Sequence, residues 1–148
     1  RYWDKGEVGD GPCGSLGSAR VLREGTDVTL LAYGPMVKTC LQAAEAAAEE
    51  GRNLEVIDLR SLSPLDEDTI LASARKTGRV VVVHEASTFL GMGSEISALV
   101  TERAFHHLEA PVLRVGGYNV PYPPSRIEEE FLPDLDRVLD AVDRSLAY

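Results

Sequence analysis

Two polar residues, His84 and Glu85, directly follow a run of four valines at positions 80–83, and a glycine-rich segment containing Gly93 and Ser94 comes shortly after them. In open parallel sheets, ligands bind beyond the carboxyl ends of the strands. The backbone N–H groups at the start of a helix attract anions. A strand that delivers His84 and Glu85 to such a helix start predicts an acid–base pair beside an anion-binding pocket.

A purely structural role accounts for the same residues. Gly91 and Gly93 suit a tight turn and close packing, with Gly93 or Ser94 as the helix cap. A single Gly-x-Gly lacks the third glycine and the downstream carboxylate of a dinucleotide-binding fingerprint. Two interpretations therefore stay open: a packing role, or a stand-alone α/β module that holds a small anion or nucleotide at residues 91–94.

The other polar clusters are weaker candidates for chemistry. His106 and His107 come at the end of a predicted helix, where adjacent side chains point in different directions, which disfavours a shared metal ion. The acids at 66–68 fall in the first turn of a predicted helix, where they complement the helix dipole. The acids at 128–130 form a solvated run. No Gly-x-Ser-x-Gly, phosphate-binding loop or His-Glu-x-x-His motif is present in the sequence.

Composition excludes several classes of partner. The 148 residues carry a net charge of −9, which argues against nucleic acid or an anionic membrane as the main partner. Positions 128–148 hold 7 acidic residues against 2 arginines, so this tail carries −5 of that charge. An acidic tail favours solubility and attracts basic partners. Cys13 and Cys40 do not form a disulfide framework, which fits a reducing cytosol.

Apolar runs alternate with helical patterns along the chain, which predicts a mostly parallel sheet covered by helices on both faces. Strands are expected at 19–23, 27–33, 54–59, 79–83 and 111–115. Helices are expected after Pro35 as far as Gly51, from 64 to 78 with Ser63 as the N-cap, from 93 to 107, and from 134 to 146. The chain does not begin with Met, and residues 1–17 are predicted to be an arm that was cut from something longer.

Several blocks of the sequence resemble the carboxyl-terminal domain of the β subunit of 2-oxo acid dehydrogenases, the E1 component of those complexes. The blocks occur in order and cover essentially the whole chain: 19–30, 33–37, 58–66, 76–79, 84–86, 108–111 and 117–121. Within this family the sequence is most similar to the branched-chain (2-oxoisovalerate) enzyme. The similarity lies in residues 117–121 and in residues 76–79, which lead into the predicted strand at 79–83.

This resemblance implies a transketolase carboxyl-domain fold: a three-layer α/β/α sandwich around a five-stranded sheet, with the strand at 19–23 antiparallel to the others. It implies that residues 18–148 are this domain and that residues 1–17 lead from a missing thiamine-diphosphate-binding domain. Thiamine diphosphate and Mg²⁺ would bind outside this chain, which supplies no catalytic, cofactor-binding or metal-binding residue and is expected to be inactive alone. The implied compartment is the cytoplasm, or the mitochondrial matrix in a eukaryote.

The resemblance also implies assembly partners. These are the E1 α subunit, a second β subunit, and the basic peripheral subunit-binding domain of the E2 acyltransferase in a multienzyme complex. Docking of E2 is expected to use Glu109, which precedes an Ala-Pro pair, and the terminal carboxylate, which would be that of Tyr148. Under this interpretation His84 and Glu85 tie their loop to a neighbouring domain or line a subunit contact, and they do not catalyse a reaction.

Overall fold

The computed structural model describes residues 15–148, and positions 1–14 of the predicted arm and Cys13 lie outside that range. Five strands form one sheet: β1 (Arg20–Arg23), β2 (Val28–Ala32), β3 (Leu54–Asp58), β4 (Val80–Ser87) and β5 (Leu113–Gly117). The α-helices are α1 (Met36–Glu49), α2 (Glu67–Thr77), α3 (Met92–Ala104), α4 (Glu128–Phe131) and α5 (Leu135–Leu146). Two short 3-10 turns, η1 (Phe105–His107) and η2 (Ser125–Ile127), follow α3 and precede α4.

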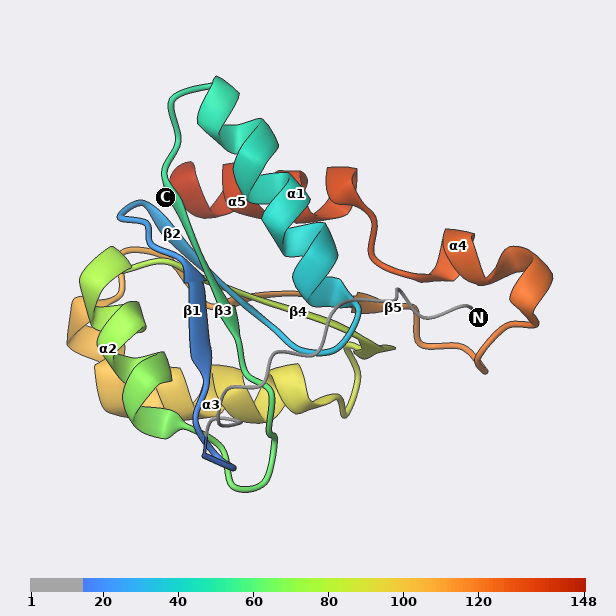
Figure 1. The fold of residues 1–148 in the computed structure, drawn as a ribbon, viewed down its shortest axis with the longest axis horizontal. Coiled ribbons are helices and arrows are strands. Elements are labelled where there is room, and N and C mark those ends of the chain that lie inside the picture. Colours follow the sequence, from blue (N-terminus) through green and yellow to red (C-terminus); the bar gives the residue numbers. More distant parts are fainter. Residues whose placement is uncertain (1–14) are drawn as a thin grey trace, which may run out of the picture.

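The strand order is β1-β3-β2-β4-β5, and β1 runs antiparallel to β3 while the other pairs are parallel. Helices α1 and α5 cover one face of the sheet, and α2 and α3 cover the other (Figure 1). The predicted three-layer sandwich with one antiparallel edge strand is confirmed. The crossovers place the starts of the parallel strands at one end of the sheet and their carboxyl ends at the other.

The central strands have no polar face because helices lie on both sides of them. All of β2 is buried, and so are the four valines that begin β4. Residues on alternate positions of these strands enter two separate hydrophobic clusters, one under α1 and α5 and one under α2 and α3. In the first cluster, burial raises the pKa of the free Cys40 thiol to about 12, so this cysteine is an inert core residue.

Several predicted boundaries are wrong for local reasons. Helix α2 begins after Asp66, not after Ser63, because the Asp66 carboxylate accepts the backbone N–H of Thr69 at 3.1 Å. Asp66 also accepts the backbone N–H of Ala19 at 2.8 Å, which anchors the segment before β1. Strand β4 continues past Val83 to Ser87, and β5 begins at Leu113, two residues later than expected.

Candidate functional site

His84 lies on β4 and is fully buried. Its Nδ1 atom is 2.9 Å from the carbonyl oxygen of Ala86, and its ring stacks on Tyr33 with the centroids 6.0 Å apart. A carbonyl can only accept a hydrogen bond, so Nδ1 carries the proton and Nε2 is the unprotonated atom of the neutral ring. Burial lowers the pKa of His84, which keeps the ring neutral at pH 7.

Three glycines enclose this ring. A Cβ atom at Gly93 would lie 2.4 Å from Nε2, and one at Gly91 or Gly116 would lie 2.9 Å from Cε1. Within residues 15–148, Nε2 has no hydrogen-bond partner. Close packing against imidazole therefore explains why these positions are glycine, and the same packing fills the space that a ligand would need at Nε2.

The remaining residues of the predicted acid–base site do not converge with His84. Glu85 lies on the opposite face of β4, because successive strand residues alternate. Burial, assisted by the charge of Glu85, raises the pKa of Tyr33, the residue that stacks on His84. The Ser94 hydroxyl donates to the Thr88 carbonyl at 3.4 Å and accepts a hydrogen bond from Arg114. The structure thus brings His84 and Gly93 together but separates them from Glu85, and the four residues do not form one pocket.

Glu109, predicted to contact a partner, lies at the other end of the sheet, beside the start of β4. Its backbone N–H donates to the Gly78 carbonyl at 2.8 Å, and its carboxylate forms an ion pair with Arg79. Gly78 has a φ of 66°, and a Cβ there would lie 2.9 Å from Glu109 Cγ and 3.0 Å from the His107 carbonyl. The side chain of Glu109 is 62% exposed, so a partner can still reach its carboxylate.

Arg79 connects Glu109 to the carboxyl-terminal helix. Its Nε–H donates to the carbonyl of Ser145 at 3.1 Å, and Tyr148 lies three residues farther along with its side chain exposed. Figure 1 shows the turn after α2, the segment after α3 and the chain terminus at the same end of the sheet. Both residues predicted for docking therefore belong to one corner. Sequence reasoning did not find Arg79, although it lies in the block 76–79 that contributed to the family resemblance.

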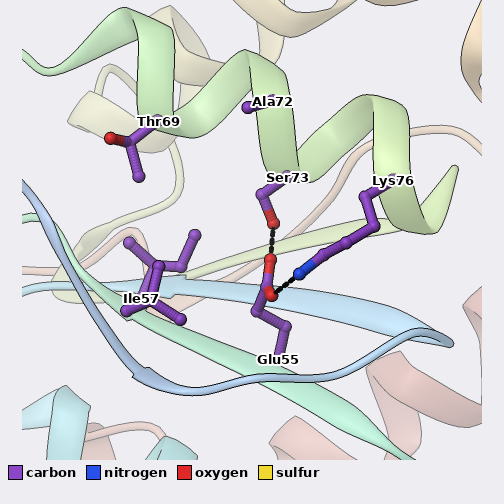
Figure 2. A pocket seen from close by; sticks show the side chains of 7 residues that line it. Glu55, Ile57, Thr69, Ala72, Ser73 and Lys76 are labelled. Carbon is purple, nitrogen blue, oxygen red and sulfur yellow. Dashed lines mark hydrogen bonds and ion pairs between the residues drawn. The ribbon is translucent and has the colours of Figure 1, made fainter.

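A second polar cluster, missed at the level of sequence, lies between β1 and α2 (Figure 2). The carboxylate of Glu55 on β3 is 1% exposed and accepts hydrogen bonds from Ser73 and Lys76. The Lys76 ammonium also donates to Glu24 at 2.8 Å. A cavity of about 220 Å³ opens above this group, with mainly apolar walls that include Val21. The sequence offers one sign of this cluster: Glu55 is an acid within the otherwise apolar run 54–57.

The chemistry of this cluster is that of a structural ion pair. Burial acts to lower the pKa of Lys76, but its hydrogen bonds to Glu24 and Glu55 outweigh burial and raise it. Lys76 therefore stays protonated and cannot serve as a base at neutral pH. Ser73 is also bound to Thr29, with the two oxygens 2.7 Å apart, so its hydroxyl belongs to a satisfied network.

Neither a metal site nor a membrane span is found in the described part of the chain. Among residues 15–148, no three His, Cys, Asp or Glu side chains are arranged to hold a metal ion. No helix in the same range is long and apolar enough to cross a bilayer.

The fold and the sequence together define the class of protein. The family model for the transketolase C-terminal domain matches residues 17–138, and the chain belongs to this family. It is 55% identical over 150 residues to the pyruvate dehydrogenase E1 component subunit beta of Leifsonia xyli, covering 100% of the chain and 44% of the relative. It is 50% identical over 148 residues to the 3-methyl-2-oxobutanoate dehydrogenase subunit beta of Mycobacterium tuberculosis, covering 99% and 42%.

A solved structure agrees with this assignment. The chain matches a split-gene transketolase, described as an inactive beta4 tetramer, with a TM-score of 0.81 and 32% identity over 95% of the chain and 45% of the other. The chain spans less than half the length of these relatives. Because pyruvate and branched-chain enzymes match at similar identity, the predicted branched-chain specificity stays a prediction.

Proposed function

We propose that this chain is the carboxyl-terminal domain of the E1 β subunit of a 2-oxo acid dehydrogenase, whose complete enzyme decarboxylates pyruvate or a branched-chain 2-oxo acid and passes the acyl group to lipoyl-E2. The observation that carries this proposal is identity of 55% and 50% to such subunits along essentially the full chain. We place the pocket for the substrate side chain outside this chain.

The role we assign to the domain itself is assembly. Binding thiamine diphosphate through Mg²⁺ requires an oxygen-rich site for the metal and the phosphates. The residues at 15–148 do not fit that requirement, since they hold no acidic metal cluster and the ring of His84 is sealed by glycines. We therefore derive no catalytic step from these residues, and we place the cofactor and Mg²⁺ in the remainder of the enzyme.

An exposed apolar surface supports the assembly role. It lies at the carboxyl end of the parallel strands and consists of the loops after β4 and β5, which are joined by a bond from the Thr88 N–H to the Gly117 carbonyl at 3.3 Å. Its exposed side chains are those of Phe89, Leu90, Tyr118, Val120 and Tyr122. Exposed apolar side chains gathered on two joined loops suit an interaction site, and the partner we propose is a second β subunit, with the α subunit alongside.

The opposite end of the sheet supports docking to E2. We call the group formed by Arg79, Glu109 and residues 145–148 the docking corner. Its partner is the basic subunit-binding domain of E2, and the group that it offers to such a partner is the exposed carboxylate of Glu109. Glu109 and Tyr148 would contact that domain directly.

Reconstitution tests the proposal. The full-length β subunit that contains this domain would be assembled with its α subunit and assayed for decarboxylation of pyruvate and of 3-methyl-2-oxobutanoate in the presence of thiamine diphosphate and Mg²⁺. Activity on either acid supports the proposal, and the preferred acid decides between the two classes of relative. Absence of activity on all 2-oxo acids, from a complex shown to be assembled, would contradict it.

The alternative of a stand-alone anion-binding module has less support. It relied on Gly91, Gly93 and Ser94, and packing around His84 and a hydrogen bond to Arg114 account for these residues. Titration of the protein with inorganic phosphate or ADP, followed by the amide signals of residues 91–94, tests it directly. Saturable shifts at micromolar concentrations would favour this alternative.

A further inference from the structure

We propose that residues 88–93 form an acid-sensitive latch over the ring of His84. While the ring is neutral, this segment stays closed on it. Protonation of the ring releases the segment, together with the exposed side chains of Phe89 and Leu90 that the segment carries. The latch is a property of the domain itself, whichever protein these side chains contact, so it does not depend on the proposed function.

Two glycines of the latch lie directly against the ring. A Cβ atom added at Gly91 would be 2.9 Å from Cε1, and one added at Gly93 would be 2.4 Å from Nε2. Gly116 of β5 closes a further side of the ring. In the part of the chain that the structure describes, Nε2 meets no hydrogen-bond partner. The closed arrangement therefore suits a ring whose Nε2 carries no proton.

A proton at Nε2 would have no acceptor in the closed arrangement. The backbone beside Nε2 belongs to Gly93, in the first turn of α3. The free N–H groups of a first helical turn are themselves donors, and they form the positive end of the helix dipole. A buried charged donor without an acceptor is strongly unfavourable. Water can satisfy this donor only by entering the space that Gly93 fills, so protonation requires the latch to open.

The charged groups around the ring also favour its neutral form. Burial lowers the pKa of His84 and the positive charge of Arg114 adds to this, so together they outweigh a hydrogen bond to a backbone carbonyl that acts to raise it. Tyr33, which stacks on the ring, has a raised pKa and carries no charge in acid. Glu85 lies on the opposite face of β4, and Glu95 in the first turn of α3 is exposed. Within residues 15–148, no carboxylate is bound to Nε2 to compensate a positive ring.

The latch is weakly attached apart from its contact with the ring. Two bonds tie its first residue, Thr88, to β5: its N–H donates to the Gly117 carbonyl at 3.3 Å, and its carbonyl accepts from Arg114 at 3.0 Å. The side chains of Phe89 and Leu90 are 63% and 86% exposed, so they bury little apolar surface. Segments with few buried apolar contacts open at a lower free energy than the whole domain needs to unfold. The latch can therefore open while the sheet stays intact.

The effect of acid on this opening has a defined size. In the open form the ring meets water and takes the ordinary pKa of about 6.5. In the closed form the pKa is lower, so the closed form has its full stability above about pH 6.5 and loses stability as the pH falls below that value. Between about pH 7.5 and about pH 5.5 the equilibrium constant for opening should rise about tenfold.

Amide hydrogen exchange tests the latch in the full-length protein that contains this domain, in its assembled state. Exchange would be measured by mass spectrometry at the same two pH values and converted to protection factors, which removes the intrinsic effect of pH on exchange. Protection of the Thr88 and Ser94 amides should fall about tenfold, while that of residues 81–83 in the central strand should stay constant. Constant protection at Thr88 and Ser94 would overturn the latch. An equal loss at residues 81–83 would also overturn it, because the whole domain would then be unfolding.

Two substitutions assign the effect to one ring. His84→Gln removes the group that titrates, so protection at Thr88 and Ser94 should be nearly the same at both pH values. His106→Gln is the matched control, because it removes an exposed imidazole beyond the far end of α3 and should keep the tenfold fall. A fall that persists in His84→Gln, or that disappears in His106→Gln, would overturn the latch.

A measurement on the unaltered protein covers the case in which His84→Gln does not assemble. Exchange of the Cε1 hydrogen of histidine, also followed by mass spectrometry, reports how far each ring is exposed to water. At neutral pH the buried ring of His84 should exchange far more slowly than the exposed ring of His106. Equal exchange of the two rings would show that the segment 88–93 does not close over His84, which would overturn the latch.

Discussion

The imidazole of His84 is held by a hydrogen bond on one side and by the backbone of three glycines on the other. Its Nδ1–H reaches the Ala86 carbonyl, and Gly91, Gly93 and Gly116 lie against the remaining ring atoms. A histidine and two nearby glycines are also what an active site would contain, and the sequence pattern does not distinguish the two cases. Gly116 shows that this histidine has a packing role. It lies on the neighbouring strand β5, and its backbone fills the space beside the His84 ring.

Acid should destabilise the domain through His84. Burial depresses its pKa in the folded state below the ordinary value of about 6.5, so the unfolded chain binds the proton more readily. Stability is thus complete above about pH 6.5 and is lost as the pH falls from there through the depressed pKa. Urea unfolding between about pH 5 and pH 8 should show this loss in the unaltered protein, and a shallower one in His84→Gln. The exposed His106 and His107 are common to both proteins, so equal slopes would contradict the assignment to His84.

Gly93→Ala should destabilise the fold by about 1–3 kcal/mol, because the added methyl group would lie 2.4 Å from His84 Nε2 and the ring has no free side to move into. Gly51→Ala is the control, since a methyl group there meets no atom and only the positive φ of 80° opposes it. The free energies of unfolding would be compared with those in a His84→Ala background. There Gly93→Ala should cost almost nothing; an equal cost in both backgrounds would rule out the ring as the cause.

At the scale of elements, Glu55 binds β3 to α2 across the more open flank of the sheet. Its two oxygens accept hydrogen bonds from Ser73 and Lys76, both on α2, and a cavity lined by Val21 and Ile57 lies beside them (Figure 2). An ion pair with one buried partner adds little net stability, but removal of Lys76 leaves the buried charge of Glu55 uncompensated. The pair therefore fixes the place of α2 more than it strengthens the domain.

Lys76→Met should lower the free energy of unfolding by about 1–3 kcal/mol, because Glu55 would keep a buried charge with one hydrogen bond. The double variant Glu55→Leu with Lys76→Met should recover most of this loss, since neither charge remains. Chemical denaturation at pH 7 measures the free energy of unfolding of the single and the double variant. A double variant less stable than Lys76→Met would show that the carboxylate itself, through Ser73, carries the stability.

The sequence predicts most of the helices and strands, but not where they begin or how distant segments contact one another. The alternation of apolar strands and helical stretches predicted the sheet, and the family resemblance predicted the antiparallel strand at the edge. The Ser-Pro pair before the helix predicts an N-cap at Ser63, but Asp66 has the carboxylate that reaches both Thr69 and Ala19. Likewise Glu109 was identified without Arg79, because their contact depends on a crossover that brings distant segments together.

At the scale of the whole molecule, the two ends of the sheet differ in character. The end where the parallel strands begin carries the docking corner, in which an ion pair joins the start of β4 to Glu109. The other end carries the exposed apolar loops after β4 and β5. A domain with separate surfaces at opposite ends can hold a β partner at one and an E2 domain at the other at the same time. We therefore expect variants at one end to leave binding at the other unchanged.

Leu90 gives the sharpest test of the apolar end. Its side chain is 86% exposed and its φ is 57°, a left-handed conformation that leucine adopts at a cost and that asparagine tolerates. Leu90→Asn should therefore leave the stability of the fold unchanged or slightly raised. Loss of an apolar contact should nevertheless weaken pairing of the β subunits. In sedimentation velocity, the assembled enzyme should therefore dissociate at a protein concentration about tenfold higher than the unaltered enzyme does.

Phe105→Ser is the control for Leu90→Asn, because it also removes an exposed apolar side chain but lies past the far end of α3. It should leave subunit pairing unchanged, which separates a specific contact from a general effect of surface hydrophobicity. E2 docking should be unchanged in Leu90→Asn, because Leu90 lies at the opposite end of the sheet from Arg79 and Glu109. If Leu90→Asn pairs as tightly as the unaltered enzyme, Leu90 lies outside the β–β contact, and the left-handed leucine must serve another partner, of which the α subunit is the first to test.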